Sequence, residues 1–429
     1  MKTYAHPFAA GVRLPSSARL ARGAGIVLLW ALIAIAIVLL AVPVALLPLA
    51  TMVPASIWLL LASADIALLV ALVRFARRRW AALAGFVAVT ALAVAASQAF
   101  AATPPIVDAS GKPLPGSIAT LEKVNLNGSE QWITIRGKDA TKPVLLYLGI
   151  GGPGAGGFPA SALTLAPLED HFVVVNWDQP GTGKSYAAAP IATLTVERFV
   201  SDAHALTQLL RARFHQDKIY VLGLSWGTIL GTKLVQQYPD LFYAYVGTGQ
   251  MVNTTENDRL GYQLAIELAA QRGDTRMVDT LRRNGPPPYV GGGMAGKYMV
   301  YNNVLFEHMG SLRIEQVLVI VPQLAREYGL VDKVNFARGL IDSYPVLYPQ
   351  LRDLDFTTQA AKVDVPMYFL VGRQDVNAVA ALVDRYYAVL DAPHKELIWL
   401  DSGHGAGADE ILDAMVNHVL VTSAPHPTQ

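Results

Sequence analysis

The sequence predicts an α/β protein with a mainly parallel central sheet, a helical insertion and preceding transmembrane helices. Short apolar runs alternate with helical segments from about residue 120, which is the pattern of a sheet covered by helices on both faces. The alternation stops between residues 250 and 356, and apolar residues concentrate before residue 100. We therefore expect a membrane region at 1–100, a linker at 101–120, a first part of the sheet domain at 120–249, a helical cap at 250–356 and a second part at 357–425.

The composition excludes several classes of protein. The formal net charge of +1 over 429 residues gives no electrostatic basis for binding nucleic acid. Cysteine is absent, so disulfides, thiol catalysis and cysteine-based metal sites are excluded. Only 16% of the residues are charged, against about 25% in an average soluble protein. This deficit agrees with a chain that is partly embedded in a membrane.

Three apolar runs near the N-terminus, Ile26–Leu47, Ile57–Val73 and Trp80–Phe100, predict three membrane spans. The first run has no charge and is long enough to cross a bilayer. The second run is short, at 17 residues, and contains Asp65, so a re-entrant or interfacial segment is the alternative to a span. We interpret Asp65 as a residue packed against neighbouring helices, with a functional acid inside the membrane as the alternative.

The charges that flank the spans predict their orientation. Lysines and arginines precede the first run or separate the second from the third, namely Lys2, Arg13, Arg19, Arg22, Arg74, Arg77, Arg78 and Arg79. The connection at 48–54 carries no charge. The positive-inside rule places the basic segments in the cytoplasm and everything after Phe100 outside it. We expect a multi-pass cell-membrane protein, with cleavage after the third span left open by the Ala99-Phe100-Ala101 motif.

The sheet elements follow the linker in order. A hairpin is predicted at 121–137, because Asn127 and Gly128 form a favoured two-residue turn. Further strands are predicted from apolar runs at 142–149, 171–178, 218–225, 242–249, 365–375 and 395–404. Helices are expected at 195–215 and 227–240, where apolar residues recur at helical spacing.

The segment "WDQPGTGKS" (177–185) resembles a nucleotide-binding P-loop, which has the pattern G-x-x-x-x-G-K-[ST]. The first glycine of that pattern is replaced by Asp178, whose carboxylate would face the phosphates. A P-loop also opens a helix at its lysine, whereas Pro190 and β-branched residues follow here. We therefore expect a structural turn, with no bound nucleotide and no phosphate on Lys184.

The strongest chemical motif is Gly223-Leu224-Ser225-Trp226-Gly227, a G-x-S-x-G pattern between a predicted strand and a predicted helix. A serine at such a sharp turn needs small neighbours, and its hydroxyl then projects from the edge of the sheet. The helix that follows places amide groups beside a developing oxyanion. Ser225 is therefore predicted to be a nucleophile.

A serine nucleophile needs a histidine base and a carboxylate that orients the base. His404 follows the last predicted strand in "DSGH", and Asp375 follows the previous one in "GRQD". Both lie at the strand ends where sites of such sheets form. Asp391 and Asp401 are rivals for the acid, but Asp401 is too close in sequence to reach the far ring nitrogen of His404. The alternative for His404 is a histidine of a surface loop.

The oxyanion hole is predicted from backbone amides. One comes from Trp226, the residue after the nucleophile. The other is expected from the glycine-rich loop "IGGPGAGG" (150–157), at Gly152 or Gly151. Glycines in this loop allow the backbone to approach the substrate carbonyl closely.

These motifs, with Gly151-Gly152-Pro153-Gly154, "WDQPGTGKS", "GLSWG", "GRQD" and "SGH", resemble the prolyl aminopeptidase branch of the α/β-hydrolases over about residues 120–420. Ile150 and Pro180 stand where that branch carries histidine and arginine. The resemblance implies an α/β-hydrolase fold and a cap whose acidic groups hold a substrate amino terminus. Glu256, Glu267 and Glu307 are the candidates by location.

The function expected from these residues is a membrane-tethered serine hydrolase that cleaves a small-molecule or short-peptide substrate through an acyl-enzyme. Such chemistry needs no cofactor and no metal. The resemblance favours peptide or amide bonds. A lipid or carboxylic ester hydrolase is the alternative, and a non-catalytic hydrolase-like receptor is the further alternative.

Overall fold

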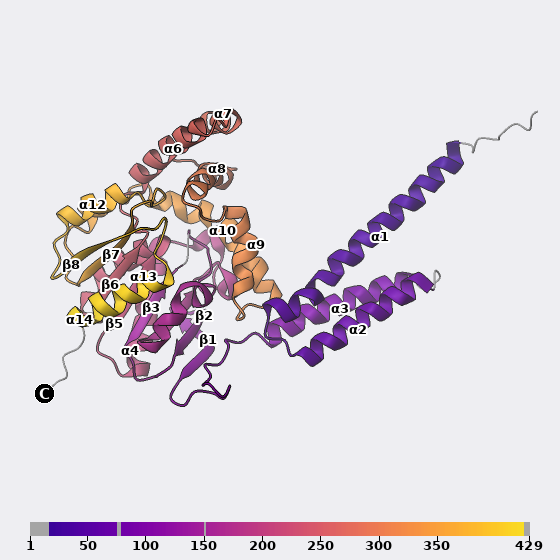
Figure 1. The fold of residues 1–429 in the computed structure, drawn as a ribbon, viewed down its shortest axis with the longest axis horizontal. Coiled ribbons are helices and arrows are strands. Elements are labelled where there is room, and N and C mark those ends of the chain that lie inside the picture. Colours follow the sequence, from indigo (N-terminus) through magenta and orange to yellow (C-terminus); the bar gives the residue numbers. More distant parts are fainter. Residues whose placement is uncertain (1–16, 75–78, 150–151, 424–429) are drawn as a thin grey trace, which may run out of the picture. The chain divides into compact units, whose positions relative to one another are not determined.

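The computed structural model describes residues 17–74, 79–149 and 152–423, and these form two compact units. The first unit holds most of three apolar helices, α1 (Ser17–Ala50), α2 (Ala55–Arg74) and α3 (Arg79–Ala99). Each contains an apolar segment of at least 20 residues, so all three predicted spans are helices long enough to cross a membrane (Figure 1). Several residues of the predictions lie outside the described residues, namely Lys2, Arg13, Arg77, Arg78 and Gly151.

The short second run is part of a longer helix than the sequence predicted. Helix α2 begins at Ala55 and has 20 residues, because Ala55, Ser56 and Arg74 extend the apolar run at its two ends. Asp65 lies in the middle of α2 and is partly buried. Within this unit, the Thr90 hydroxyl of α3 donates to the Leu40 carbonyl of α1 over 2.7 Å.

The second unit is built on an eight-stranded sheet with the order β1-β2-β4-β3-β5-β6-β7-β8. Its strands are β1 (Ile118–Leu126), β2 (Ser129–Gly137), β3 (Val144–Leu148), β4 (Val173–Asp178), β5 (Ile219–Leu224), β6 (Phe242–Thr248), β7 (Met367–Gly372) and β8 (Lys395–Leu400). The pairs β1–β2 and β2–β4 are antiparallel, and all other neighbours are parallel. The predicted hairpin is confirmed, with Asn127 and Gly128 both at positive φ in its turn.

Both faces of the sheet are covered, as the alternation predicted. One face packs against α4 (Val196–Phe214), α5 (Trp226–Gln237) and α12 (Ala380–Val389). The other face packs against the helical turns at 161–170 and against α13 (Ala408–Asp413) and the turns that follow it, up to α14 (Leu420–Ser423).

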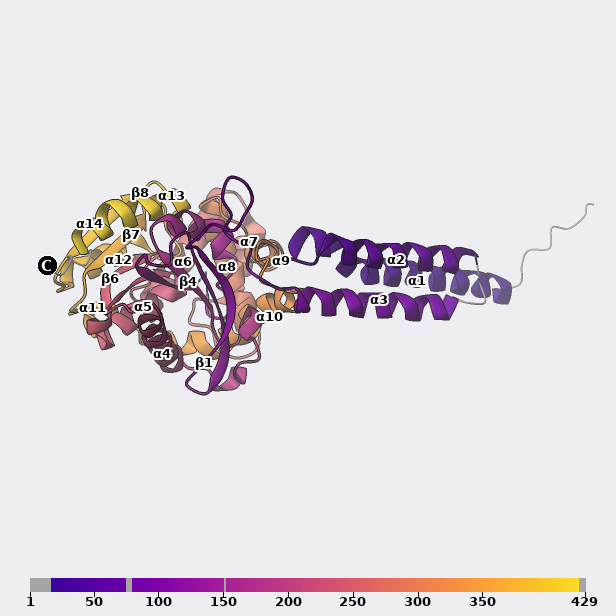
Figure 2. The ribbon, with the colours of Figure 1, turned by 90° about the horizontal axis from the view of Figure 1, so that it is seen from below.

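The helical insertion lies between β6 and β7. It comprises α6 (Thr254–Gln271), α7 (Thr275–Asn284), α8 (Met294–His308), α9 (Ile314–Leu324), α10 (Leu330–Leu347) and the short α11 (Phe356–Gln359). These helices have an apolar cluster of their own, which includes Tyr262, Leu281 and Leu305. Figures 1 and 2 show α6 to α10 gathered beside the sheet rather than within it, which agrees with the predicted cap.

The turn after β4 has the structural role that the sequence predicted. The Asp178 carboxylate accepts hydrogen bonds from the backbone amides of Gly157 and Lys184, both at 2.9 Å. A short 3-10 turn, not an α-helix, begins at Gly183. The Lys184 ammonium lies 2.9 Å from Asp332 of α10, and both side chains are almost completely buried. The lysine therefore joins the sheet unit to the cap.

Candidate active site

Ser225 lies between β5 and α5 in a strained conformation, with φ 53° and ψ −113°. This region is unfavourable for a residue with a side chain, and it turns the serine out of the sheet edge. The flanking glycines are required sterically. A Cβ on Gly227 would lie 1.4 Å from the Leu148 carbonyl oxygen, and one on Gly223 would lie 2.7 Å from the Gly227 oxygen.

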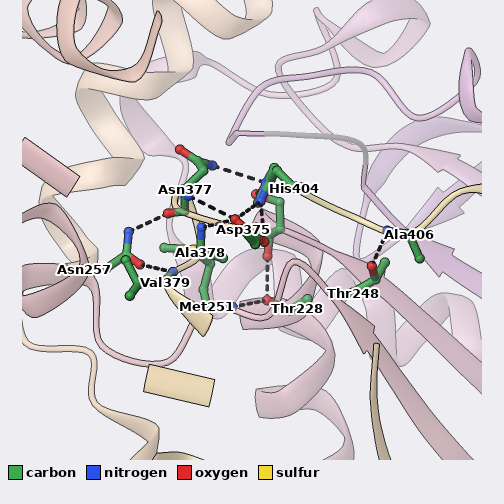
Figure 3. Close-up of polar contacts among 11 residues, drawn as sticks. Thr228, Thr248, Met251, Asn257, Asp375, Asn377, Ala378, Val379, His404 and Ala406 are labelled. Atoms are coloured by element: carbon green, nitrogen blue, oxygen red, sulfur yellow. Dashed lines mark hydrogen bonds and ion pairs between the residues drawn. The ribbon is translucent and has the colours of Figure 1, made fainter. Parts of the chain in front are cut away.

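The structure brings together Ser225, His404 and Asp375 from the loops after β5, β8 and β7. The Ser225 Oγ lies 3.0 Å from His404 Nε2, and His404 Nδ1 lies 3.0 Å from Asp375 Oδ2. Asp375 is held by the backbone amides of Asn377 and Ala378, at 2.9 and 2.8 Å (Figure 3). The buried carboxylate therefore faces the imidazole with fixed geometry.

The rival carboxylates lie elsewhere. Asp401 has a side chain that is 94% exposed and pairs with Arg373. Asp391 is exposed, and its backbone bonds with residues 361–363.

The electrostatic environment of His404 favours its protonated form. Burial alone would lower the pKa of the imidazole, because it penalises the charged form. The negative charge of Asp375 and its hydrogen bond together outweigh burial, so the pKa of His404 is raised above the usual 6.5. Since Asp375 accepts from Nδ1–H, the neutral imidazole presents Nε2 as the acceptor for the serine proton.

Two of the residues predicted to form the oxyanion hole, Trp226 and Gly152, lie beside Ser225 in the structure. Trp226 is the first residue of α5, so its amide has no acceptor within the helix. Its indole points into the core, where Nε1 donates to Gln179 over 3.0 Å. Gly152 lines the same cavity as Ser225 and His404.

This cavity has a volume of about 360 Å³ and reaches from Ser225 into the cap. Its cap wall is mostly apolar and comes from α8, α9 and α10, including Phe306, Val317, Leu318, Phe336 and Leu340. A space of this size accommodates a small molecule or a short peptide.

The acidic residue of the cavity is one that sequence reasoning missed. None of Glu256, Glu267 and Glu307 lines the cavity, whereas Asp258 of α6 does. Its carboxylate accepts hydrogen bonds from three phenols, those of Tyr298, Tyr301 and Tyr348, at 3.0, 2.8 and 2.7 Å. Burial raises the pKa of Asp258 to about 6, although the three hydrogen bonds oppose the rise.

A signal for Asp258 was present in the sequence. The buried residues of α6 recur at helical spacing and include Thr254, Asp258, Gly261, Tyr262 and Ala265. Asp258 therefore falls on the inward stripe, while Glu256 and Glu267 fall on the outer face.

Asn377 is a second residue that the sequence did not reveal. Its Nδ2 lies 3.2 Å from His404 Nε2, the nitrogen that also contacts Ser225. Its backbone carbonyl accepts a bond of 2.7 Å from Asn257 of α6 (Figure 3). Asn377 thus connects the imidazole to the cap.

In the part of the chain that the structure describes, no three histidine, aspartate or glutamate side chains gather in a group that could hold a metal ion.

An α/β sheet with a capped pocket and a strained serine at its edge defines the hydrolase class. A family model described as serine aminopeptidase, S33, matches residues 162–285. The probable aminopeptidase YbaC of Bacillus subtilis (strain 168) is 32% identical over 284 residues, which cover 65% of this chain and 88% of that protein. The chain belongs to this α/β-hydrolase family of serine aminopeptidases.

Two further proteins are similar to this chain. The proline iminopeptidase of Heyndrickxia coagulans is 23% identical over 256 residues, covering 59% of this chain and 82% of that protein. The crystal structure of a proline iminopeptidase-related protein from Thermus thermophilus covers 72% of this chain and 99% of its own, with 19% identity and a TM-score of 0.50. The structural likeness supports the fold.

Proposed function

We propose that the protein is a serine hydrolase that cleaves acyl bonds through an acyl-enzyme. The observation that carries the proposal is the line of contacts from Ser225 to His404 to Asp375, each of 3.0 Å, at the base of the cavity. A hydroxyl, an imidazole and a buried carboxylate in this order are the arrangement that nucleophilic acyl transfer requires.

The reaction proceeds in two halves. Ser225 Oγ attacks the acyl carbon while His404 Nε2 takes its proton, and the amides of Trp226 and Gly152 bind the oxyanion. His404 then gives the proton to the leaving group, and the acyl group remains on Ser225 as an ester. Water attacks this ester with the same proton transfers and releases the acid. The carboxylate of Asp375 holds the ring of His404 in place and stabilises the imidazolium.

We propose peptide or amide bonds with a free amino group nearby as the substrates. The relatives are named as aminopeptidases, and Asp258 supplies a carboxylate inside the cavity. A carboxylic ester hydrolase is the second candidate, because the cavity wall is mostly apolar. A non-catalytic receptor is disfavoured because it would not need the strained conformation of Ser225.

We further propose that α1, α2 and α3 cross the cell membrane and that the hydrolase unit lies outside the cytoplasm. The support is the charge asymmetry of the flanking segments together with an odd number of candidate spans.

Labelling with a fluorophosphonate probe tests the nucleophile. The full-length protein should be labelled, and Ser225→Ala should lose both labelling and turnover. Ser402→Ala is a control that removes a serine outside the contacts of the site. A panel of prolyl and other aminoacyl arylamides against p-nitrophenyl esters then separates the candidates. Full turnover by Ser225→Ala on every substrate of the wild type would refute the mechanism.

A further inference from the structure

The cap exposes an apolar surface on α9 and the start of α10. We define this α9–α10 apolar face by its exposed residues, namely Leu312, Val319, Ile320, Leu324, Val331 and Val334. Val319 is 67% exposed and Val334 is 59% exposed, so most of each side chain is open to its surroundings. Exposed apolar side chains that gather on neighbouring elements mark a surface that binds a partner or a membrane.

Helix α9 carries apolar residues on both of its faces, and Gln316 is exposed beside those of the outer face. Its inner residues Val317, Leu318 and Val321 line the cavity, while Val319 and Ile320 face outward. Its one charged residue is Glu315, in the first turn. A surface helix of a globular protein normally carries polar residues on its outer face. The composition of α9 is that of a helix with apolar surroundings on both sides.

The last turn of α3 and the residues that follow it are bonded to the start of α10 and to the connection between α9 and α10. The Ser97 hydroxyl accepts from the Leu330 amide at 2.9 Å, and Gln98 Nε2 donates to Asp332 over 3.2 Å. Thr103 donates to the buried carboxylate of Glu327 over 2.7 Å. All of these residues belong to the second compact unit, which includes the chain from Ser97 onward. The start of α10 and the α9–α10 connection are therefore fixed to the last turn of α3, at the end of the candidate span, and to the residues just after it.

We propose that the α9–α10 apolar face docks on a lipid bilayer, with its side chains inserted at the membrane interface. The chain carries three apolar helices long enough to span, and tethering raises the effective concentration of the bilayer for a surface that would bind weakly alone. Arg313 and Arg338 are half exposed beside the face, where basic side chains favour anionic headgroups. Glu315 and Asp342 lie near them, so apolar insertion rather than charge supplies the attraction.

Docking would place the cavity wall at the membrane. Because α9 separates the cavity from the proposed interface, a substrate dissolved in the bilayer would enter past this helix. This consequence rests on the proposed function, and it predicts lipophilic amides or esters as substrates. The docking itself does not depend on activity.

The absence of cysteine allows a direct test on the full-length protein. Val319→Cys and, as a matched control, Val389→Cys on α12 each receive a nitroxide label, and the protein is reconstituted in phosphatidylcholine vesicles with some phosphatidylglycerol. Collision with oxygen and with a water-soluble nickel chelate is measured by electron paramagnetic resonance. We expect the label at 319 to collide with oxygen and to be shielded from nickel, and the label at 389 to be accessible to nickel.

Three results would overturn the docking proposal. Equal access of nickel to both positions would show a face in water. Shielding of position 319 from both reagents would show a protein cover. Spin–spin broadening at 319 that disappears on dilution with unlabelled protein would show a second copy of the chain.

An activity measurement tests the consequence for substrates. The double variant with Val319→Asp and Ile320→Asp should lose about tenfold or more in kcat/KM on a long-chain ester or amide held in vesicles, because charged side chains oppose insertion. It should keep its activity on a short soluble substrate, as should Val389→Asp on both. An equal loss on both substrates would contradict entry past α9. A wild type inactive on both, with position 319 still in lipid, would refute the proposed function and leave the docking intact.

Discussion

The tight turn at Ser225 gives a quantitative prediction for Gly227→Ala. The new Cβ would lie 1.4 Å from the Leu148 oxygen, whereas such contacts are essentially never shorter than 3.0 Å, so the start of α5 must shift by 3.0 − 1.4 = 1.6 Å. The contact is with backbone of the central strand β3, which cannot rotate away as a side chain could. The shift carries Ser225 and the Trp226 amide with it. Because a misplacement of about 1 Å can cost about 100-fold in rate, we expect kcat to fall by about 100-fold or more.

The assay is kcat on the best arylamide or ester, together with the rate of fluorophosphonate labelling and the melting temperature. Gly296→Ala is the control, because nothing lies within 4 Å of its Cβ and its φ is ordinary for a side chain. We expect the control to match the wild type and Gly227→Ala to lose labelling and thermal stability. A Gly227→Ala protein with wild-type kcat and melting temperature would refute the steric account of the motif.

Three further predictions follow from the contacts of the site and the cap. His404 acts as a base only when neutral and its pKa is raised, so kcat/KM should fall as the pH drops through a midpoint above 6.5. Asn377→Ala removes a donor to the neutral ring and should therefore move that midpoint upward. A rate–pH profile that is the same in the variant and the wild type would contradict this. Lys184→Ala removes the counter-ion of the buried Asp332 and should lower the unfolding free energy by about 3–5 kcal/mol in chemical denaturation. Combining Lys184→Ala with Asp332→Asn should recover most of this stability. Neither the wild type nor the variants should bind ATP. A periplasm-active reporter fused after residue 115 should be active, whereas activity only of a cytoplasmic reporter would overturn the proposed orientation.

The sequence revealed the parts of the fold that depend on local pattern. Buried parallel strands are continuous apolar runs, so β3, β4 and β5 were visible without any structure. The order of Ser225, Asp375 and His404 could be predicted because each follows a strand whose end lies at one edge of the sheet. The three candidate spans were visible because each is an apolar run long enough to cross a membrane.

The cap was predicted only as a helical region, because its side-chain partners are set by tertiary packing. Asp258 meets its phenols from α8 and from the turn that follows α10, which are separated from it by 40 to 90 residues. No local pattern predicts such a cluster. Asn377 was missed for a related reason, because its contact with His404 depends on how two loops after different strands approach each other.

The turn that resembles a P-loop shows how the same lysine can take a different role. In a P-loop, the lysine meets a phosphate, and here its anionic partner is Asp332 of the cap. The carboxylate of Asp332 also accepts from the Gly329 amide at 2.9 Å and from Gln98 at 3.2 Å. One buried acid therefore joins the turn after β4, the start of α10 and the last turn of α3. Because α10 also supplies Leu340 to the cavity wall, this junction couples the position of the wall to the point where the chain leaves its last apolar helix.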